Sequence, residues 1–146
     1  MKHDTPLSLR RALPGPFLAL IGAQAAHSVE EYIGRLYLVF PPARFVSGLV
    51  SEDLERGFVI ANVGLVSAGL LCFLGPILGG WRAARPIATF WAVLETLNGM
   101  GHLGWSLLQL RYTPGVATAP LLLIFSLWLA RRLLGSPRTA WSRWRR

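Results

Sequence analysis

Long apolar stretches, separated by short polar or breaking segments, dominate the pattern of this chain. Three of them cover residues 57–80, 86–110 and 115–134, and polar residues interrupt a fourth, at residues 15–40. Each approaches or exceeds the roughly 20 residues that an α-helix needs to cross a bilayer. Backbone groups inside lipid must be satisfied within the segment, which favours helices. The pattern therefore predicts an all-α protein, a transmembrane bundle of four helices.

Proline and glycine punctuate this pattern and divide the chain of 146 residues. The breaks are Pro41-Pro42, Gly79-Gly80 and Thr113-Pro114-Gly115. We expect residues 1–14 to form an N-terminal cytoplasmic segment and residues 15–135 a single four-helix domain. Residues 136–146 then form a basic cytoplasmic tail. The length agrees with one domain.

The positions of the basic residues predict the orientation of the bundle. The chain is 53% hydrophobic and only 15% charged, with a net charge of +8, which is unlike an ordinary soluble domain. With four spans, the two termini and the loop after residue 80 share one side, which holds Lys2, Arg10, Arg11, Arg82, Arg85, Arg131, Arg132, Arg138, Arg143, Arg145 and Arg146. The other side holds Arg44, Arg56 and Arg111. The positive-inside rule then places both termini in the cytoplasm.

Two features at the ends of the chain have alternative interpretations. Arg10-Arg11, an apolar run and Ala23-Gln24-Ala25 resemble a cleavable signal peptide. The chain stays apolar beyond that point, so we favour an uncleaved first span. The Trp- and Arg-rich tail at residues 141–146 resembles a nucleic-acid-binding segment in charge alone. Because it follows a hydrophobic span, we expect it to bind anionic lipid headgroups and no nucleic acid, at about 1 kcal/mol per basic residue.

Polar side chains form one stripe on the first span and another on the third. The first contains Gln24, His27, Glu31 and Arg35, with Glu30 beside it, and the second contains Trp91, Glu95, Asn98, His102, Trp105 and Gln109. An ionisable residue at mid-bilayer costs at least ~2.5 kcal/mol on insertion scales, and most such residues are functional. We therefore expect the two stripes to face each other inside the protein.

The depths of these residues support the pairing. Counting about 1.5 Å per residue from Gly15 and Pro86 places His27 and Asn98 at about 18 Å, and Glu31 and His102 at about 24 Å. Asn62 and Thr118 reach a similar level on the second and fourth spans. All four helices then contribute polar atoms to one layer.

The polar residues also carry a recognisable pair of motifs. Residues 27–31 read H-x-x-E-E and residues 98–102 read N-x-x-x-H, and a Tyr-Thr-Pro-Gly turn at 112–115 leads into the last helix. Together they resemble the HXXEE-motif family of small bacterial membrane proteins. The resemblance covers most of the chain, implies a location in the bacterial inner membrane, and carries over the motif positions His27, Glu30, Glu31, Asn98 and His102. It brings no established reaction with it.

The leading hypothesis for these residues is a metal site. His27 and Glu31 lie one helical turn apart and can bind one ion, with His102 completing the ligand set. Two imidazoles and a carboxylate suit zinc, or iron in an oxygen-dependent enzyme. We assign proton transfer to Glu30 and Glu95, and an orienting role to Asn98. The protein would then be an intramembrane hydrolase or oxidoreductase acting on a hydrophobic small molecule from the surrounding membrane lipid.

Three other interpretations stay open. A Glu–His pair without metal can act as the acid and base of an isomerase or cyclase for a lipid or isoprenoid, with Trp91 and Trp105 shielding a carbocation. Intramembrane Glu and His also occur in proton-coupled or accessory subunits that are not enzymes. Polar residues of this kind also join helices without further function. The sequence identifies neither the substrate nor the oligomeric state.

Overall fold

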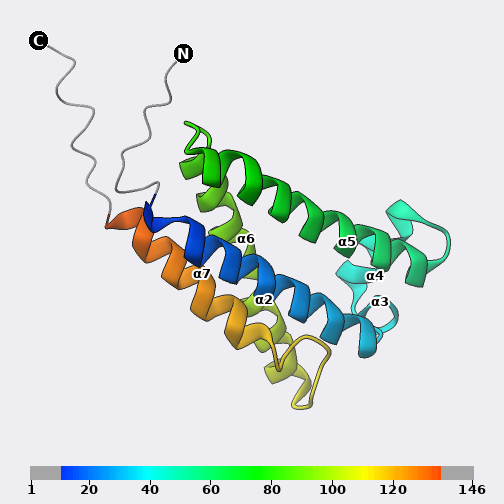
Figure 1. Ribbon diagram of the computed structural model, residues 1–146. Helices are drawn as coiled ribbons and strands as arrows, with labels where there is room; N and C mark the ends of the chain where they lie inside the picture. The colour runs from blue at the N-terminus through cyan, green and yellow to red at the C-terminus, as the bar shows by residue number, and fades with distance from the viewer. Residues whose placement is uncertain (1–10, 136–146) are drawn as a thin grey trace, which may run out of the picture.

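A computed structural model describes residues 11–135 of the chain. This part is built of helices joined by short loops, so the all-α prediction is confirmed for it (Figure 1). The elements are α2 (Pro14–Ile33), α3 (Leu36–Val39), α4 (Pro41–Val50), α5 (Leu54–Cys72), the π-helical turn η1 (Phe73–Ile77), α6 (Ala84–Gln109) and α7 (Ala119–Leu134). The basic tail and its predicted lipid contacts lie outside the described residues.

The first helix is shorter than the predicted span of residues 15–40. Helix α2 ends at Ile33, where the Gly34 N–H donates to the Glu30 carbonyl (2.9 Å) and Arg35 adopts a left-handed φ of 52°. Arg35 follows the end of α2 and is exposed, so the stripe on this helix ends with Glu31. The chain continues as the short α3 and then α4, which starts at Pro41, a residue well suited to a first helical turn.

Local signals explain the bounds of the next helices. Asp53 caps α5 by accepting from the backbone N–H groups of Glu55 (2.9 Å) and Arg56 (3.1 Å). Pro76 lies inside η1, where the wider π-helical turn accommodates a residue without an N–H. The last helix begins at Ala119, because residues 114–118 form a turn, and not at the predicted residue 115.

Helix α2 lies between α5 and α7, and α6 crosses behind them in the view of Figure 1. Both α2 and α6 pack chiefly against α7, and α4 packs against the start of α5. Two apolar clusters result. The larger joins α2, η1, α6 and α7 and includes Phe17, Leu20, Trp91 and Leu129, and the smaller contains Leu36, Tyr37 and Phe58. The polar residues of α2 and α6 lie between these clusters.

The outer surface of the helices is strongly apolar. Large hydrophobic side chains are exposed on each long helix, for example Val29 on α2, Leu71 on α5, Leu97 on α6 and Ile124 on α7. Within the described residues, one helical stretch, Leu54–Ile77, is both long and apolar enough to cross a membrane on those criteria. Apolar surface on this scale marks a face that contacts lipid or another protein.

Candidate metal centre

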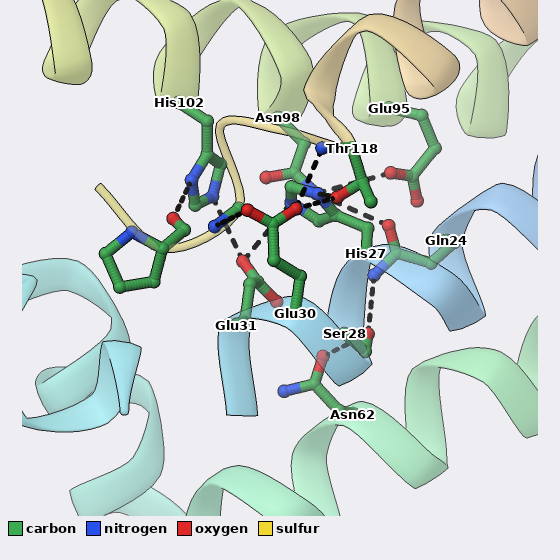
Figure 2. A network of polar contacts seen from close by, with 12 residues as sticks. Gln24, His27, Ser28, Glu30, Glu31, Asn62, Glu95, Asn98, His102 and Thr118 are labelled. Carbon is green, nitrogen blue, oxygen red and sulfur yellow. Dashed lines mark hydrogen bonds and ion pairs between the residues drawn. The ribbon is translucent and has the colours of Figure 1, made fainter. Parts of the chain in front are cut away.

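Three ionisable side chains from two helices meet in the protein interior. His27 and Glu31 lie one turn apart on α2, and His102 approaches from α6 (Figure 2). Glu31 Oε1 lies 3.3 Å from His27 Nε2 and 3.0 Å from His102 Nε2. The two imidazole rings meet edge to face with centroids 4.6 Å apart, and all three residues are buried. The predicted pairing of the stripes is thus realised at these positions.

A backbone carbonyl determines the orientation of His102. Its Nδ1 lies 2.8 Å from the carbonyl oxygen of Pro114. Since a carbonyl oxygen only accepts hydrogen bonds, Nδ1 must carry the proton. In the neutral ring the Nε2 lone pair then points toward Glu31.

A relay through Thr118 orients His27 in the same way. The Thr118 hydroxyl donates to Glu30 Oε2 (2.5 Å), so its oxygen can only accept from His27 Nδ1, which is 2.8 Å away. His27 Nδ1 therefore carries the proton, and its Nε2 presents a lone pair. That Nε2 atom is buried and has no hydrogen-bond partner among the described residues.

Two imidazole lone pairs and a carboxylate oxygen therefore face one small space. The ligand atoms of His27, Glu31 and His102 lie within 4.8 Å of one another. One proton can relieve the repulsion between Glu31 and one imidazole, whereas a single cation can relieve it at both. Histidine ligands with the other ring N–H held by a carbonyl or a carboxylate-linked group are typical of metal sites. The residues present therefore fit a divalent metal ion.

Glu30 lies outside this space and binds the loop that carries the two orienting groups. Its carboxylate accepts from Tyr112 Oη (2.7 Å), from the backbone N–H groups of Gly115 (3.1 Å), Ala117 (3.1 Å) and Thr118 (2.8 Å), and from the Thr118 hydroxyl. The hydrogen bond to the Glu30 carboxylate raises the pKa of Tyr112 to about 12. We predicted a proton-transfer role for Glu30, but its position is that of an anchor for residues 112–118.

Two glycines allow this loop to approach the histidines. Gly115 has φ +92°, and a Cβ there would lie 2.5 Å from His102 Nδ1 and 2.9 Å from His27 Cε1. A Cβ at Gly34 would lie 2.5 Å from the Pro114 side chain. From the sequence, residues 112–115 are predicted only as a turn. The signal that could have shown more is the Pro-Gly pair, because the chain folds back at this turn to the level of the motif residues on the helices.

A second hydrogen-bonded group lies beside the His–Glu cluster and includes Glu95. Asn98 Nδ2 donates to Glu95 Oε2 (3.3 Å) and to Gln24 Oε1 (3.4 Å). Gln24 donates to Ser28 Oγ (3.1 Å), which donates to Asn62 Oδ1 (2.7 Å). Glu95 is completely buried, and its Oε1 has no hydrogen-bond partner among the described residues. The predicted layer of polar atoms therefore includes α5 through Asn62 and the turn before α7 through Thr118.

The remaining residues of the predicted third-span stripe lie elsewhere. Trp91 packs edge to face with Phe17 in the larger apolar cluster, with centroids 6.2 Å apart. Trp105 packs against Phe40 with centroids 4.5 Å apart, and Gln109 is exposed at the end of α6. Of the polar stripe predicted on the third span, only Glu95, Asn98 and His102 therefore belong to the site.

A cavity of about 340 Å³ adjoins the candidate metal site at Glu31 and His102. Its polar wall consists of Glu31, His102, Asn98, Gln24 and Asn62. The other walls are mostly apolar, with Ser47 among them, and come from α3, α4, α5 and the residue between α3 and α4: Leu36, Phe40, Pro42, Ala43, Val46, Ser47, Phe58, Ala61 and Leu65. A mostly apolar cavity with a few convergent polar groups is typical of a small-molecule site.

Fold and site together define an all-helical protein with a buried cluster of two histidines and one glutamate that can hold a metal ion. The chain belongs to the family described as "Protein of unknown function with HXXEE motif", whose match covers residues 18–129. This match confirms the resemblance drawn from the two motifs. No curated protein and no solved structure shows significant similarity to the chain.

Proposed function

We propose that this protein is an integral membrane metalloenzyme whose zinc or iron ion is held by His27, Glu31 and His102. The observation that carries the proposal is the orientation of the two imidazoles. Because Pro114 and Thr118 hold both Nδ1 protons, both Nε2 atoms are free to bind an ion beside Glu31. Three protein ligands leave coordination positions for a reactant, as in catalytic zinc sites and in iron oxygenases with two histidines and one carboxylate.

The ion would supply Lewis acidity, which polarises an oxygen atom of a bound molecule. The residues around the ion have the other roles in the proposed site. Glu31 and the histidines hold the ion, and Thr118 with the Pro114 carbonyl keeps the rings in the binding orientation. Glu30 holds the loop on which both of these groups lie. We assign proton transfer to Glu95, and its burial beside Asn98 with one carboxylate oxygen free of hydrogen-bond partners in the described part of the chain supports this role. This arrangement suits a hydrolase or an oxidoreductase.

We place the protein in the bacterial inner membrane, with α2, α5 and η1, α6 and α7 crossing it and both termini in the cytoplasm. The apolar outer faces of these helices support this location, as does the apolar stretch Leu54–Ile77. The excess of Arg at one end of the proposed bundle supports the orientation. The surrounding lipid is then the source of a hydrophobic substrate.

Metal content tests the proposal. We expect detergent-purified protein, prepared without chelators, to contain close to one equivalent of zinc or iron per chain. His27→Ala and His102→Ala should lose the metal, because each removes a ligand. Glu52→Gln, which changes an exposed carboxylate in the loop before α5, should keep it. Retained helicity and elution volume confirm folding. A folded wild-type chain without metal, or equal metal content in the histidine variants, would contradict the proposal.

Metal-free acid–base catalysis on a lipid or isoprenoid is the second candidate. The observation that favours it is the completely buried Glu95, whose Oε1 lacks a hydrogen-bond partner in the described part of the chain. Trp105 supports it to a lesser degree, because it packs on Phe40 at the cavity wall. The same metal analysis separates the two candidates, since this one requires a folded, metal-free protein that is active and loses activity in Glu95→Gln.

A further inference from the structure

The hydrogen bonds around Asn98 leave one acceptor directed at the cavity. Its Nδ2 donates to Glu95 Oε2 and to Gln24 Oε1. Because the Gln24 amide nitrogen donates to Ser28, the Gln24 oxygen faces Asn98, and the Asn98 amide must present its nitrogen there. This assigns the opposite atom, Oδ1, to the cavity side, and Figure 2 shows it directed toward His102. Among the described residues, no group donates a hydrogen bond to Asn98 Oδ1. A molecule in the cavity can therefore donate one.

The charge of the cavity wall restricts the head group of such a molecule. Glu31 is the only acidic residue in the lining, and no Lys or Arg of the described chain contributes to it. An ionised phosphate or sulfate head has no O–H to donate to Asn98 Oδ1 and meets no cationic side chain in the lining. A quaternary ammonium head would be repelled by a bound metal ion and also has no O–H donor. An uncharged head fits better. To use both the metal centre and Asn98 Oδ1, it must offer an oxygen lone pair and an O–H donor.

The remaining walls restrict the rest of the molecule. Phe40, Val46, Phe58 and Leu65 offer apolar contacts over most of the surface. The volume of about 340 Å³ lies at the low end of the range for ligand sites, roughly 300–1,000 Å³. Pro42 and Val46 on α4 are exposed, so the cavity opens beside α4 onto the apolar surface of the protein. This shape suits one slender chain that enters sideways from lipid.

We propose that this cavity binds a single-chain lipid alcohol, with its hydroxyl group between His102 and Asn98 and its chain along α4 and α5. The hydroxyl oxygen faces the metal centre, and the hydroxyl proton is donated to Asn98 Oδ1. The inference rests on the proposed metalloenzyme function for its ion, and it adds the chemical class of the molecule that the site binds. Two-chain phospholipids and phosphorylated isoprenoids fit this site less well, because an ionised phosphate has no O–H for Asn98 Oδ1 and meets no Lys or Arg in the lining.

Photolabelling in lipid nanodiscs tests the proposal. The probe is decanol carrying a diazirine near the end of its chain, and the labelled peptides are mapped by mass spectrometry. We expect saturable labelling of α4 and α5 near Val46 and Leu65. The matched methyl ether lacks the donor and should bind about two- to tenfold more weakly, as expected for the loss of one hydrogen bond. The matched phosphate and trimethylammonium probes also lack the donor, so their saturable labelling of these peptides should be weaker than that of the alcohol.

Two variants on α5 provide the control. Ala61→Phe fills the cavity from a wall that contributes no metal ligand. This variant should therefore lose saturable labelling but keep its bound metal. Ala68→Phe adds the same side chain at an exposed position of the same helix and should label like wild type. Equal labelling by the alcohol and ether probes, or persistent labelling in Ala61→Phe, would overturn the inference. Metal content measured on the same samples tests the metal centre separately, so the two failures are distinguishable.

Discussion

Two histidines far apart in sequence owe their orientation to one loop, residues 112–118. Pro114 supplies a carbonyl to His102, and Thr118 supplies a hydroxyl oxygen to His27. Glu30 ties both groups to α2 through the backbone of the same loop. The second Glu position of the motif, Glu31, contacts the imidazoles, whereas the first, Glu30, contacts the loop. The adjacent carboxylates of the motif therefore have different surroundings and, in our account, different tasks.

The Thr118 relay gives a first prediction. Thr118→Val keeps the shape of the side chain but removes the oxygen that accepts from His27 Nδ1. We expect metal affinity to fall by about 10- to 100-fold, the usual effect of losing a group that orients a ligand. Affinity is measured by competition with a chelator. Thr96→Val, which removes a hydroxyl bonded to Ser126 between α6 and α7, is the matched control. Equal losses in both variants would show that the effect is structural.

The Tyr112–Glu30 hydrogen bond gives a prediction about pH. The bond raises the pKa of Tyr112 from 10.0 to about 12. A raised folded-state pKa means that the stabilisation is fully present below about pH 10 and is lost as the pH rises through about 12. Tyrosinate absorbance of the folded protein should therefore include a step near pH 12 that is missing in Tyr112→Phe. A step near pH 10 for Tyr112 would contradict the hydrogen bond.

At the scale of elements, the close approach of α2 and α5 depends on Gly69. A Cβ at this position would lie 2.6 Å from Ile21 Cδ1, whereas a Cβ at Gly64 would meet nothing within 4 Å. We expect Gly69→Leu to destabilise the fold by roughly 1–3 kcal/mol through overpacking. Gly64→Leu should have a much smaller effect. The measurement is the free energy of unfolding in detergent, and equal values for the two variants would contradict this packing.

The hydrophobic pattern predicted an all-α protein, which the described residues confirm. It did not predict the end of α2 at Ile33, because residues 36–40 are as apolar as a continuing helix. The reason lies in tertiary contacts: Gly34 packs against Pro114, and Leu36 and Tyr37 pack against Phe58 of α5. A sequence pattern records apolar character but not which neighbour covers it. The short α3 and α4, which form much of the cavity wall, were therefore not foreseen.

The candidate site was predictable where helical spacing alone determines it. His27, Glu31 and His102 were placed together by spacing and depth, and they do converge. The roles of Thr118 and Pro114 depend on how a turn folds back, which periodicity does not describe. The tautomers of His27 and His102 likewise depend on their hydrogen-bond partners, which the sequence does not reveal. Geometry therefore adds the orientation of the ligands to a residue set that the sequence already contained.

At the scale of the whole molecule, the proposed topology predicts which loops reach each side of the membrane. Ser51 lies in the loop before α5, and Ala83 lies in the loop before α6. In a Cys72→Ser background, a membrane-impermeant maleimide should label Ser51→Cys from the periplasm once the outer membrane is permeabilised. Ala83→Cys should be labelled only after the inner membrane is opened. The reverse pattern would invert the topology, and labelling of both from outside would contradict the crossing of α5.

The most direct measurement of the central claim is the X-ray absorption spectrum of the zinc-loaded protein. Our account predicts scattering from two imidazole rings and a carboxylate oxygen at about 2.0–2.2 Å from the metal. One imidazole should disappear in His102→Ala, and the spectrum of Glu52→Gln should match that of wild type. A spectrum without imidazole scattering, or one that is the same in His102→Ala, would contradict the shared binding of one ion by α2 and α6.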